Sequence, residues 1–176
     1  MKVGNTKPLS SPLSPVLSVV KTLTFVQAES PAQIAQARGL FLEYAQSLGF
    51  SLCFQNFDKE LEELPGDYAP PQGRLLLAEY EGQLAGCVAM RPLEPGACEM
   101  KRLYLRLQFR CKGLGHALTE RIIAEARQVG YQRMCLDTVE PVMKDAVAMY
   151  RKRGFREIPP YRENPIAGAM YMELKL

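Results

Sequence analysis

The sequence predicts a single-domain α/β fold in which a mixed central sheet of about seven strands carries helices on both faces. Short apolar runs with the periodicity of strands alternate along the chain with longer segments of helical periodicity. Glycine and proline pairs separate these segments and mark turns. The chain has 176 residues, of which 47% are hydrophobic and 23% are charged, and this suits one globular domain with a sizeable core.

The first third of the chain predicts one strand and two helices. Residues 22–28 read as the strand, and the first helix starts at Ser30-Pro31, because serine caps free N–H groups and proline fits the first helical turn. Gly49 ends this helix. A shorter helix is expected over residues 57–64. The apolar positions of the first helix recur at helical spacing: Ile34, Ala37, Phe41, Ala45 and Leu48.

The middle of the chain predicts three consecutive strands. Strands over residues 74–80 and 84–91 flank Glu81-Gly82, a dipeptide typical of tight hairpin turns. Pro95-Gly96 forms a second turn, which leads into a strand over residues 98–107.

The last part of the chain alternates helices with strands. A helix is expected over residues 113–129, a strand over 133–139 and a further helix over 143–153. The final hairpin starts with residues 155–158 and returns over 169–176, where methionine and leucine occupy every second position. The first of these helices has one apolar face, made by Leu118, Ile122, Ala126 and Val129.

Residues 110–117, Arg-Cys-Lys-Gly-Leu-Gly-His-Ala, form the most informative segment of the chain. A loop of this kind directs backbone N–H groups into one small volume, and the helix behind it adds N–H groups that have no partners. Glycines let a ligand approach where a Cβ would collide. Because the helix dipole also favours an anion, we predict a phosphate-binding site. The spacing matches neither the dinucleotide fingerprint, since position 118 is leucine, nor the P-loop.

The charges are unevenly distributed around this loop. The formal net charge of +3 is too small to indicate a nucleic-acid partner. Basic residues nevertheless gather in the segment that leads into the loop, where the sole acid is Glu99. A basic patch there would suit a ligand with several phosphates, whereas a solvated strand end is the plainer interpretation. The basic residues are Lys101, Arg102, Arg106, Arg110 and Lys112.

No metal site or membrane segment is predicted. The 5 cysteines lack Cys-x-x-Cys spacing, and His116 is the one histidine. Reduced thiols in a cytoplasmic protein are the simplest interpretation. No segment is apolar for long enough to span a bilayer. Residues 1–20, which prolines interrupt, are predicted to be a flexible extension of a domain over residues 21–176.

Two motifs carry a resemblance to a known family. The pattern Arg-x-x-Gly-x-Gly-x-Ala over residues 110–117 resembles the pyrophosphate loop of the GNAT superfamily of acyl-CoA-dependent N-acetyltransferases. Residues 146–155, Ala-Val-Ala-Met-Tyr-Arg-Lys-Arg-Gly-Phe, are similar to the second signature of that family. The predicted order of elements is also that of the GNAT fold, so the resemblance covers roughly residues 22–176. One departure is Met143, where many members carry an asparagine that contacts the pantetheine arm.

The resemblance implies acetyl-CoA as cosubstrate, no metal, and direct transfer of the acetyl group to an amine. It assigns the pantetheine amides to the backbone of Leu103, Tyr104 and Leu105. Cys111 is not expected to be a nucleophile, because no base accompanies it and the family transfers directly. The residues assigned to the pyrophosphate are Arg110, Cys111, Lys112, Gly113, Leu114, Gly115, His116 and Ala117.

Acetyl transfer needs a neutral amine, a stabilised carbonyl oxygen and a proton for the leaving thiolate. An amine with a pKa of about 10.4 costs about 4–5 kcal/mol to hold neutral at pH 7. The resemblance makes Tyr150 the general acid that protonates the sulfur, with packing against the sheet as its structural alternative. Glu99, on the strand before the loop, matches a catalytic glutamate of some members and is the candidate general base. Its alternative is an exposed ion pair with Lys101 or Arg102.

The acceptor site is the least defined part of the prediction. In the GNAT fold it is built from the first helices and the final hairpin loop. We expect a small, amino-acid-like amine as acceptor, and Arg162 would suit a substrate carboxylate unless it is a solvated loop residue. A protein N-acetyltransferase and a non-catalytic acyl-CoA-binding regulatory module are the alternatives. A homodimer stays open, since an exposed last strand could pair between copies. The residues that these segments offer are Tyr44, Phe54, Gln55, Tyr161, Arg162 and Asn164.

Overall fold

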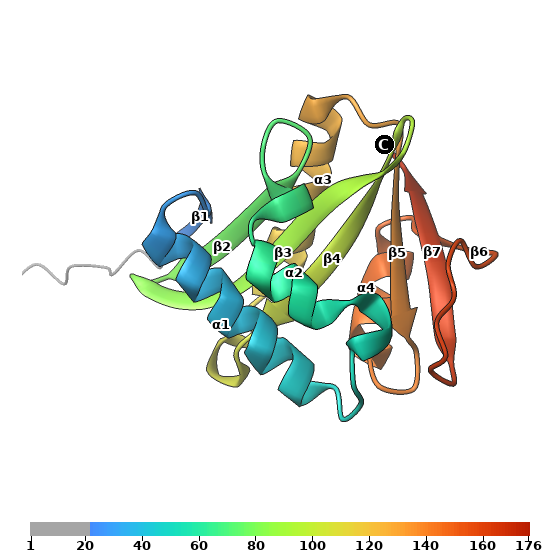
Figure 1. The fold of residues 1–176 in the computed structure, drawn as a ribbon, viewed down its shortest axis with the longest axis horizontal. Coiled ribbons are helices and arrows are strands. Elements are labelled where there is room, and N and C mark those ends of the chain that lie inside the picture. Colours follow the sequence, from blue (N-terminus) through green and yellow to red (C-terminus); the bar gives the residue numbers. More distant parts are fainter. Residues whose placement is uncertain (1–21) are drawn as a thin grey trace, which may run out of the picture.

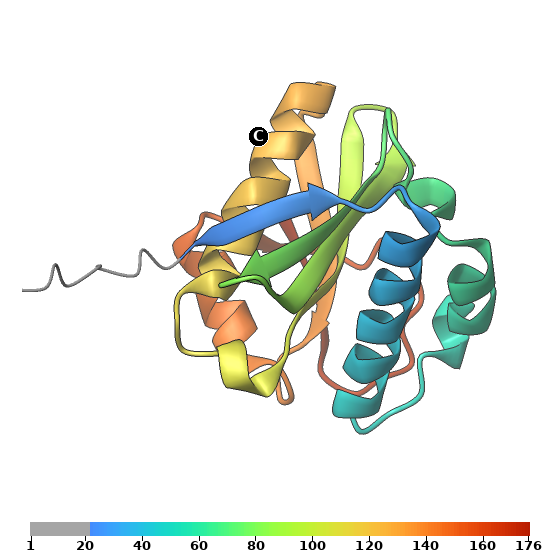
Figure 2. The same ribbon diagram turned by 90° about the vertical axis from the view of Figure 1, so that its left-hand side faces the viewer.

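The computed structural model describes residues 22–176, and the extension predicted at residues 1–20 lies outside them. One seven-stranded sheet forms the centre, in the order β1-β2-β3-β4-β5-β7-β6 (Figure 1). Viewed along the sheet, helices cover both of its faces (Figure 2). The mixed α/β fold class predicted from the sequence is therefore confirmed.

Every helix and strand expected over residues 22–176 is present. The largest differences are that β3 continues to Glu94 and that β4 ends at Leu105. The elements up to β3 are β1 (Leu23–Gln27), α1 (Pro31–Ser47), the 3-10 helix η1 (Cys53–Gln55), α2 (Phe57–Glu63), η2 (Gly66–Tyr68), β2 (Arg74–Tyr80) and β3 (Gln83–Glu94). The remaining elements are β4 (Ala97–Leu105), η3 (Leu107–Phe109), α3 (Leu114–Val129), β5 (Arg133–Val139), α4 (Lys144–Lys152), β6 (Arg156–Ile158) and β7 (Ala169–Lys175). Among the described residues, no helix is both long and apolar enough to cross a membrane.

The start of α1 shows how local sequence fixes an element. The Ser30 hydroxyl accepts a hydrogen bond from the backbone N–H of Gln33 (3.3 Å), and the Gln33 side chain accepts one from the backbone N–H of Ser30 (3.0 Å). This capping box satisfies two N–H groups that a helix start leaves without partners. The side chains that α1 then buries against the sheet include Leu40 and Phe41.

The two larger apolar cores lie between the sheet and the helices that Figure 2 shows on its opposite faces. The core under α1 and α2 includes Leu40, Phe41, Phe57, Leu75 and Cys87. The core under α3 and α4 includes Val88, Leu118, Ile122, Val147 and Met172. Because both faces are covered, the middle residues of the inner strands β3, β4 and β5 are largely buried.

A β-bulge interrupts the pairing of β3 with β4. Two steps along β3, from Cys87 to Ala89, lie opposite three steps along β4, from Tyr104 to Lys101. Arg102 adopts a left-handed backbone conformation there (φ 58°), and its carbonyl accepts a hydrogen bond from the Cys87 thiol (3.4 Å). The extra residue shifts the alternation of side chains. Lys101 and Arg102 consequently both contact the side of the sheet that η1 and α2 cover.

Candidate active-site cleft

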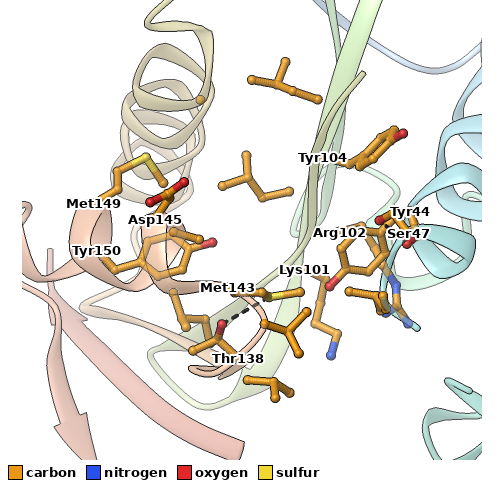
Figure 3. A pocket seen from close by; sticks show the side chains of 18 of the residues that line it. Tyr44, Ser47, Lys101, Arg102, Tyr104, Thr138, Met143, Asp145, Met149 and Tyr150 are labelled. Atoms are coloured by element: carbon orange, nitrogen blue, oxygen red, sulfur yellow. Dashed lines mark hydrogen bonds between the residues drawn. The ribbon is translucent and has the colours of Figure 1, made fainter. Parts of the chain in front are cut away.

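Strands β4 and β5 run parallel but pair over a short distance only. Their register runs from Ala97 opposite Arg133 to Glu99 opposite Cys135. Beyond this point the strands separate, and a cleft of about 950 Å³ lies between them (Figure 3). Its walls come from β4, β5, the end of α1, the start of α3 and the first turns of α4. Leu103 and Tyr104 border the cleft on the side where no strand pairs with β4, so their backbone groups can bind a ligand.

The start of α3 forms one end of the cleft. Gly113 is its N-cap residue in a left-handed conformation (φ 78°), no side chain caps the helix, and the first turn contains no acid. The first N–H groups of α3 are therefore open to an anion, which the helix dipole favours. A Cβ on Gly113 would meet no atom of the protein within 4 Å, so the space in front of this turn is free.

The predicted loop residues divide into two groups. Those that line the cleft are Arg110, Cys111, Gly113, Leu114, Gly115 and His116. Lys112 and Ala117 are not part of its lining: the Lys112 ammonium lies over the rings of Tyr80 (5.3 Å) and Phe109 (5.6 Å). The Arg110 guanidinium donates a hydrogen bond to the carbonyl of Leu105 (3.1 Å).

The predicted basic patch is mostly neutralised, and this corrects the prediction from the sequence. Lys101 pairs with Asp137 of β5 (3.0 Å), and the guanidinium of Arg102 pairs with Glu60 of α2 (2.9 Å). Arg106 pairs with Glu43 of α1 (2.8 Å). The acids come from segments far away in the sequence, so the local count of charges did not include them. Arg110 and Lys112 form no ion pair with the described residues.

Tyr150 lies on α4 and enters the cleft (Figure 3). Its side chain is largely buried, with 6% of its surface exposed, and the ring packs against Phe155 at 5.5 Å between centroids. No described residue hydrogen-bonds to its hydroxyl. Burial raises the pKa of Tyr150 well above its ordinary value, and Tyr44 on the opposite wall adds to this effect. The hydroxyl therefore keeps its proton at neutral pH and has a free hydrogen to donate.

Glu99 is completely buried and does not line the cleft. Its carboxylate accepts hydrogen bonds from Arg91 (3.0 Å), from the hydroxyl of Tyr161 (2.9 Å) and from Arg162, and Lys101 lies 3.8 Å away. Burial alone would raise the pKa of Glu99, but these cations hold it below the ordinary value. The exposed ion pair considered for Glu99 is thus wrong, and the geometry does not favour its predicted role as general base.

Asp137 is a cleft residue that the sequence analysis missed. It lies on β5 just past the last pair with β4, and its side chain is 5% exposed. One carboxylate oxygen accepts from Lys101 (3.0 Å), and the other accepts from the amides of Gln55 (3.1 Å) and Asn164 (3.2 Å). Burial would raise the pKa of Asp137, whereas the charge of Lys101 lowers it below the ordinary value. The available signal was an acid that follows three apolar residues within the strand.

The residues predicted for the acceptor divide between two cavities. Tyr44, Phe54, Gln55 and Asn164 line the cleft. Tyr161 and Arg162 instead line a neighbouring cavity of about 520 Å³, which Phe54 and Gln55 also border. Arg162 is not a solvated loop arginine, because it pairs with buried Glu99. The ion pair between Arg162 and Glu99 thereby connects the final hairpin loop to β4 beside the cleft.

Two further residues of the cleft were not predicted as contacts. Thr138 of β5 donates a hydrogen bond to the sulfur of Met143 (3.2 Å), and both line the cleft (Figure 3). Met143 thus occupies the wall where the resemblance expected an asparagine, and it presents a thioether in place of an amide.

Comparison with known proteins shows which proteins this chain resembles in sequence and in fold. Residues 40–155 match the family model described as acetyltransferase (GNAT) family. The chain is 41% identical over 148 residues to an uncharacterized N-acetyltransferase of Schizosaccharomyces pombe, covering 83% of this chain and 90% of the relative. It is 34% identical over 112 residues to an IAA acetyltransferase of Azospirillum brasilense, covering 61% of this chain and 71% of the relative. The fold is similar to that of a GNAT-family acetyltransferase of Staphylococcus aureus, with a TM-score of 0.72, 15% identity and coverage of 88% and 99% of the two chains.

Proposed function

The chain belongs to the GNAT acetyltransferase family, and we propose that it transfers an acetyl group from acetyl-CoA directly to the primary amine of a small, amino-acid-like molecule. That the chain is an acetyltransferase follows from the family. The class of acceptor and the roles of individual residues are our proposal, and they rest on the cleft.

The cleft has features that fit acetyl-CoA. The uncapped start of α3 offers N–H groups to a pyrophosphate, and Gly113 leaves the space in front of them open. Arg110 adds an exposed positive charge at the same end. The backbone of Leu103 and Tyr104, free on its β5 side, would bind the amides of the pantetheine arm. Bound in this way, acetyl-CoA supplies an acetyl group activated as a thioester.

Tyr150 is the proposed general acid. Its hydroxyl is protonated at neutral pH, has no partner among the described residues and enters the cleft between β4 and β5. In the transfer, a C–N bond forms to the amine while the C–S bond breaks. Tyr150 donates its proton to the leaving sulfur and regains one from the amine or from solvent, so the hydroxyl is unchanged after each turnover.

The buried polar groups at the inner end of the cleft support a small acceptor. The side chains of Lys101 and Asp137 are 4% and 5% exposed, so only a narrow group can reach them. The observation on which the proposal mainly rests is therefore the combination of an open helix N-terminus and a narrow polar end in one cleft.

The test is acetyl-CoA-dependent release of CoA in the presence of amino acids, polyamines, aminoglycosides and short peptides. Free CoA must be separated from the protein before it is measured, because Cys53 and Cys111 are exposed thiols that react with the same reagents. Mass spectrometry of the acceptor then identifies the acetylated atom. An amino acid or another small amine that gains one acetyl group supports the proposal. Acetylation of peptides alone, or no transfer despite acetyl-CoA binding in calorimetry, contradicts it.

A further inference from the structure

The inner end of the cleft has two hydroxyl groups without partners. Tyr44 of α1 and Tyr150 of α4 lie on opposite walls of the cleft (Figure 3). Among the described residues neither hydroxyl forms a hydrogen bond, although the ring of Tyr44 contacts Arg102 (5.9 Å). Burial raises the pKa of Tyr44 to about 12. Buried tyrosine hydroxyls usually have a partner. Tyr150 is buried and Tyr44 is partly buried, so two open hydroxyls that face the same space favour a polar ligand there.

Hydrogen-bond donors predominate around this space. Lys101 and the amides of Gln55 and Asn164 all direct N–H groups toward Asp137. The acidic residues that line the cleft within the described part of the chain are Asp137 and Asp145, and Asp145 lies in the exposed first turn of α4. An incoming amine is itself a donor of hydrogen bonds, so it requires an acceptor group in a buried site. Asp137 is the anionic acceptor at this end.

Asp137 has capacity for one more hydrogen bond. An ionised carboxylate has about four acceptor positions, and the three neighbours of Asp137 use three of them. The carboxylate is nineteen-twentieths buried yet still borders the cleft. Lys101, at 3.0 Å, stabilises its charge, so Asp137 stays ionised at neutral pH.

We propose that Asp137 binds the amine of the acetyl acceptor. This inference rests on the proposed function and specifies how the acceptor is held: one N–H of the amine donates to Asp137, which fixes the nitrogen between Tyr44 and Tyr150. The site therefore favours an amine over its deamino analogue, because the analogue has no N–H to donate to the open acceptor position of Asp137; the nitrogen attacks in its neutral form.

A purely structural role for Asp137 makes a different prediction. Asp137 also connects η1, β4 and the final hairpin loop through Gln55, Lys101 and Asn164. If this connection were its whole function, loss of the carboxylate would displace the walls of the cleft. Binding of every acceptor-site ligand would then weaken, with or without an amine.

The experiment compares the best acceptor of the panel with its deamino analogue, used as an inhibitor. Asp137→Asn removes the charge and keeps the shape, and we expect the KM for the acceptor to rise about 10- to 100-fold. The inhibition constant of the deamino analogue should change less than about threefold, since it never contacts the carboxylate. Asp58→Asn, which removes an exposed carboxylate of α2 that lines neither cavity, should leave both values unchanged. Asp137→Glu keeps the charge and should restore most of the preference for the amine.

Each outcome is decisive. An unchanged KM in Asp137→Asn, or a parallel loss of acceptor and analogue binding, overturns the inference and leaves the proposed function intact. If Asp137→Asn fails to fold in a thermal melt, Asp137→Glu decides: equal affinity for amine and analogue in that variant counts against the inference. A wild-type enzyme that acetylates no small amine overturns the proposed function and this inference together.

Discussion

Replacing Tyr150 by phenylalanine removes one oxygen atom from the cleft and nothing else. Because no described residue hydrogen-bonds to that hydroxyl, no partner is left unsatisfied, and the packing against Phe155 is retained. A buried hydroxyl without a partner is unfavourable, so the free energy of unfolding should stay the same or rise by up to about 1 kcal/mol. If Tyr150 is the general acid, kcat should fall by about 10²- to 10⁴-fold, which corresponds to about 2.7–5.5 kcal/mol of activation free energy.

The assay is steady-state CoA release over a pH series, with acetyl-CoA binding measured separately by calorimetry. The dissociation constant for acetyl-CoA should not change, since Tyr150 is assigned no part in binding it. Tyr131→Phe is a matched control, because its hydroxyl bonds to the carbonyl of Gln72 outside the cleft (3.1 Å). The raised pKa of Tyr150 keeps it protonated, so wild-type activity should show no loss due to this group below about pH 10. A variant that retains more than about a tenth of kcat at every pH would refute the acid role.

Three further predictions concern the cofactor end and the buried charges. Gly113→Ala puts a Cβ at a left-handed position (φ 78°) and should raise the KM for acetyl-CoA about tenfold. Gly130→Ala (φ 98°), at the other end of α3, is the control. Both variants should lower the free energy of unfolding by about 1–2 kcal/mol, but Gly130→Ala should leave the KM for acetyl-CoA unchanged. Glu99→Ala leaves two guanidinium groups without their carboxylate and should lower the free energy of unfolding, measured in urea, by about 3–5 kcal/mol. A decrease of less than about 1 kcal/mol would mean that the buried network contributes little to stability. The pKa values of Glu60, Glu99 and Asp137 are all lowered in the folded state. These carboxylates therefore stabilise the folded state fully at a pH above their pKa values in the unfolded chain, which are about 4. This stabilisation is lost as the pH falls through their pKa values in the folded state. Urea midpoints should therefore decrease below about pH 4, and a midpoint that stays constant there would argue against these ion pairs.

Elements of this fold could be predicted where the signal is local. The capping box at Ser30 and the left-handed glycines at the ends of helices act within a few residues, and they placed α1 and α3 closely. The loop proposed to bind phosphate could be placed at the start of α3 for the same reason, because its glycines and the helix behind it are consecutive in the chain. The position of Tyr150 in the cleft agrees with its place in a contiguous motif.

The acceptor end could not be predicted, because it depends on contacts between distant segments. Gln55 and Asp137 lie 82 positions apart, and the partner of Arg102 lies 42 positions away, on α2. From the sequence alone, Lys101 and Arg102 counted as part of a basic patch, and Glu99 counted as a general base or as an acid in an exposed ion pair. The sheet brings each of them to an opposite charge, so a composition that suggested a basic patch became a set of buried pairs.

The bulge in β4 positions the side chains that connect the two walls of the cleft. A regular strand would place Lys101 and Arg102 on opposite faces, but the extra residue directs both toward the α1–α2 side. Arg102 then holds α2 through Glu60, and Lys101 reaches across to Asp137 on β5, past the last backbone pair at Glu99. An ion pair thus links the two strands at the point where their backbone hydrogen bonds end. Backbone hydrogen bonds would hold β4 and β5 together if their pairing continued. Because the buried ion pair stabilises the strands where that pairing stops, they can stay apart and leave backbone groups free for a ligand.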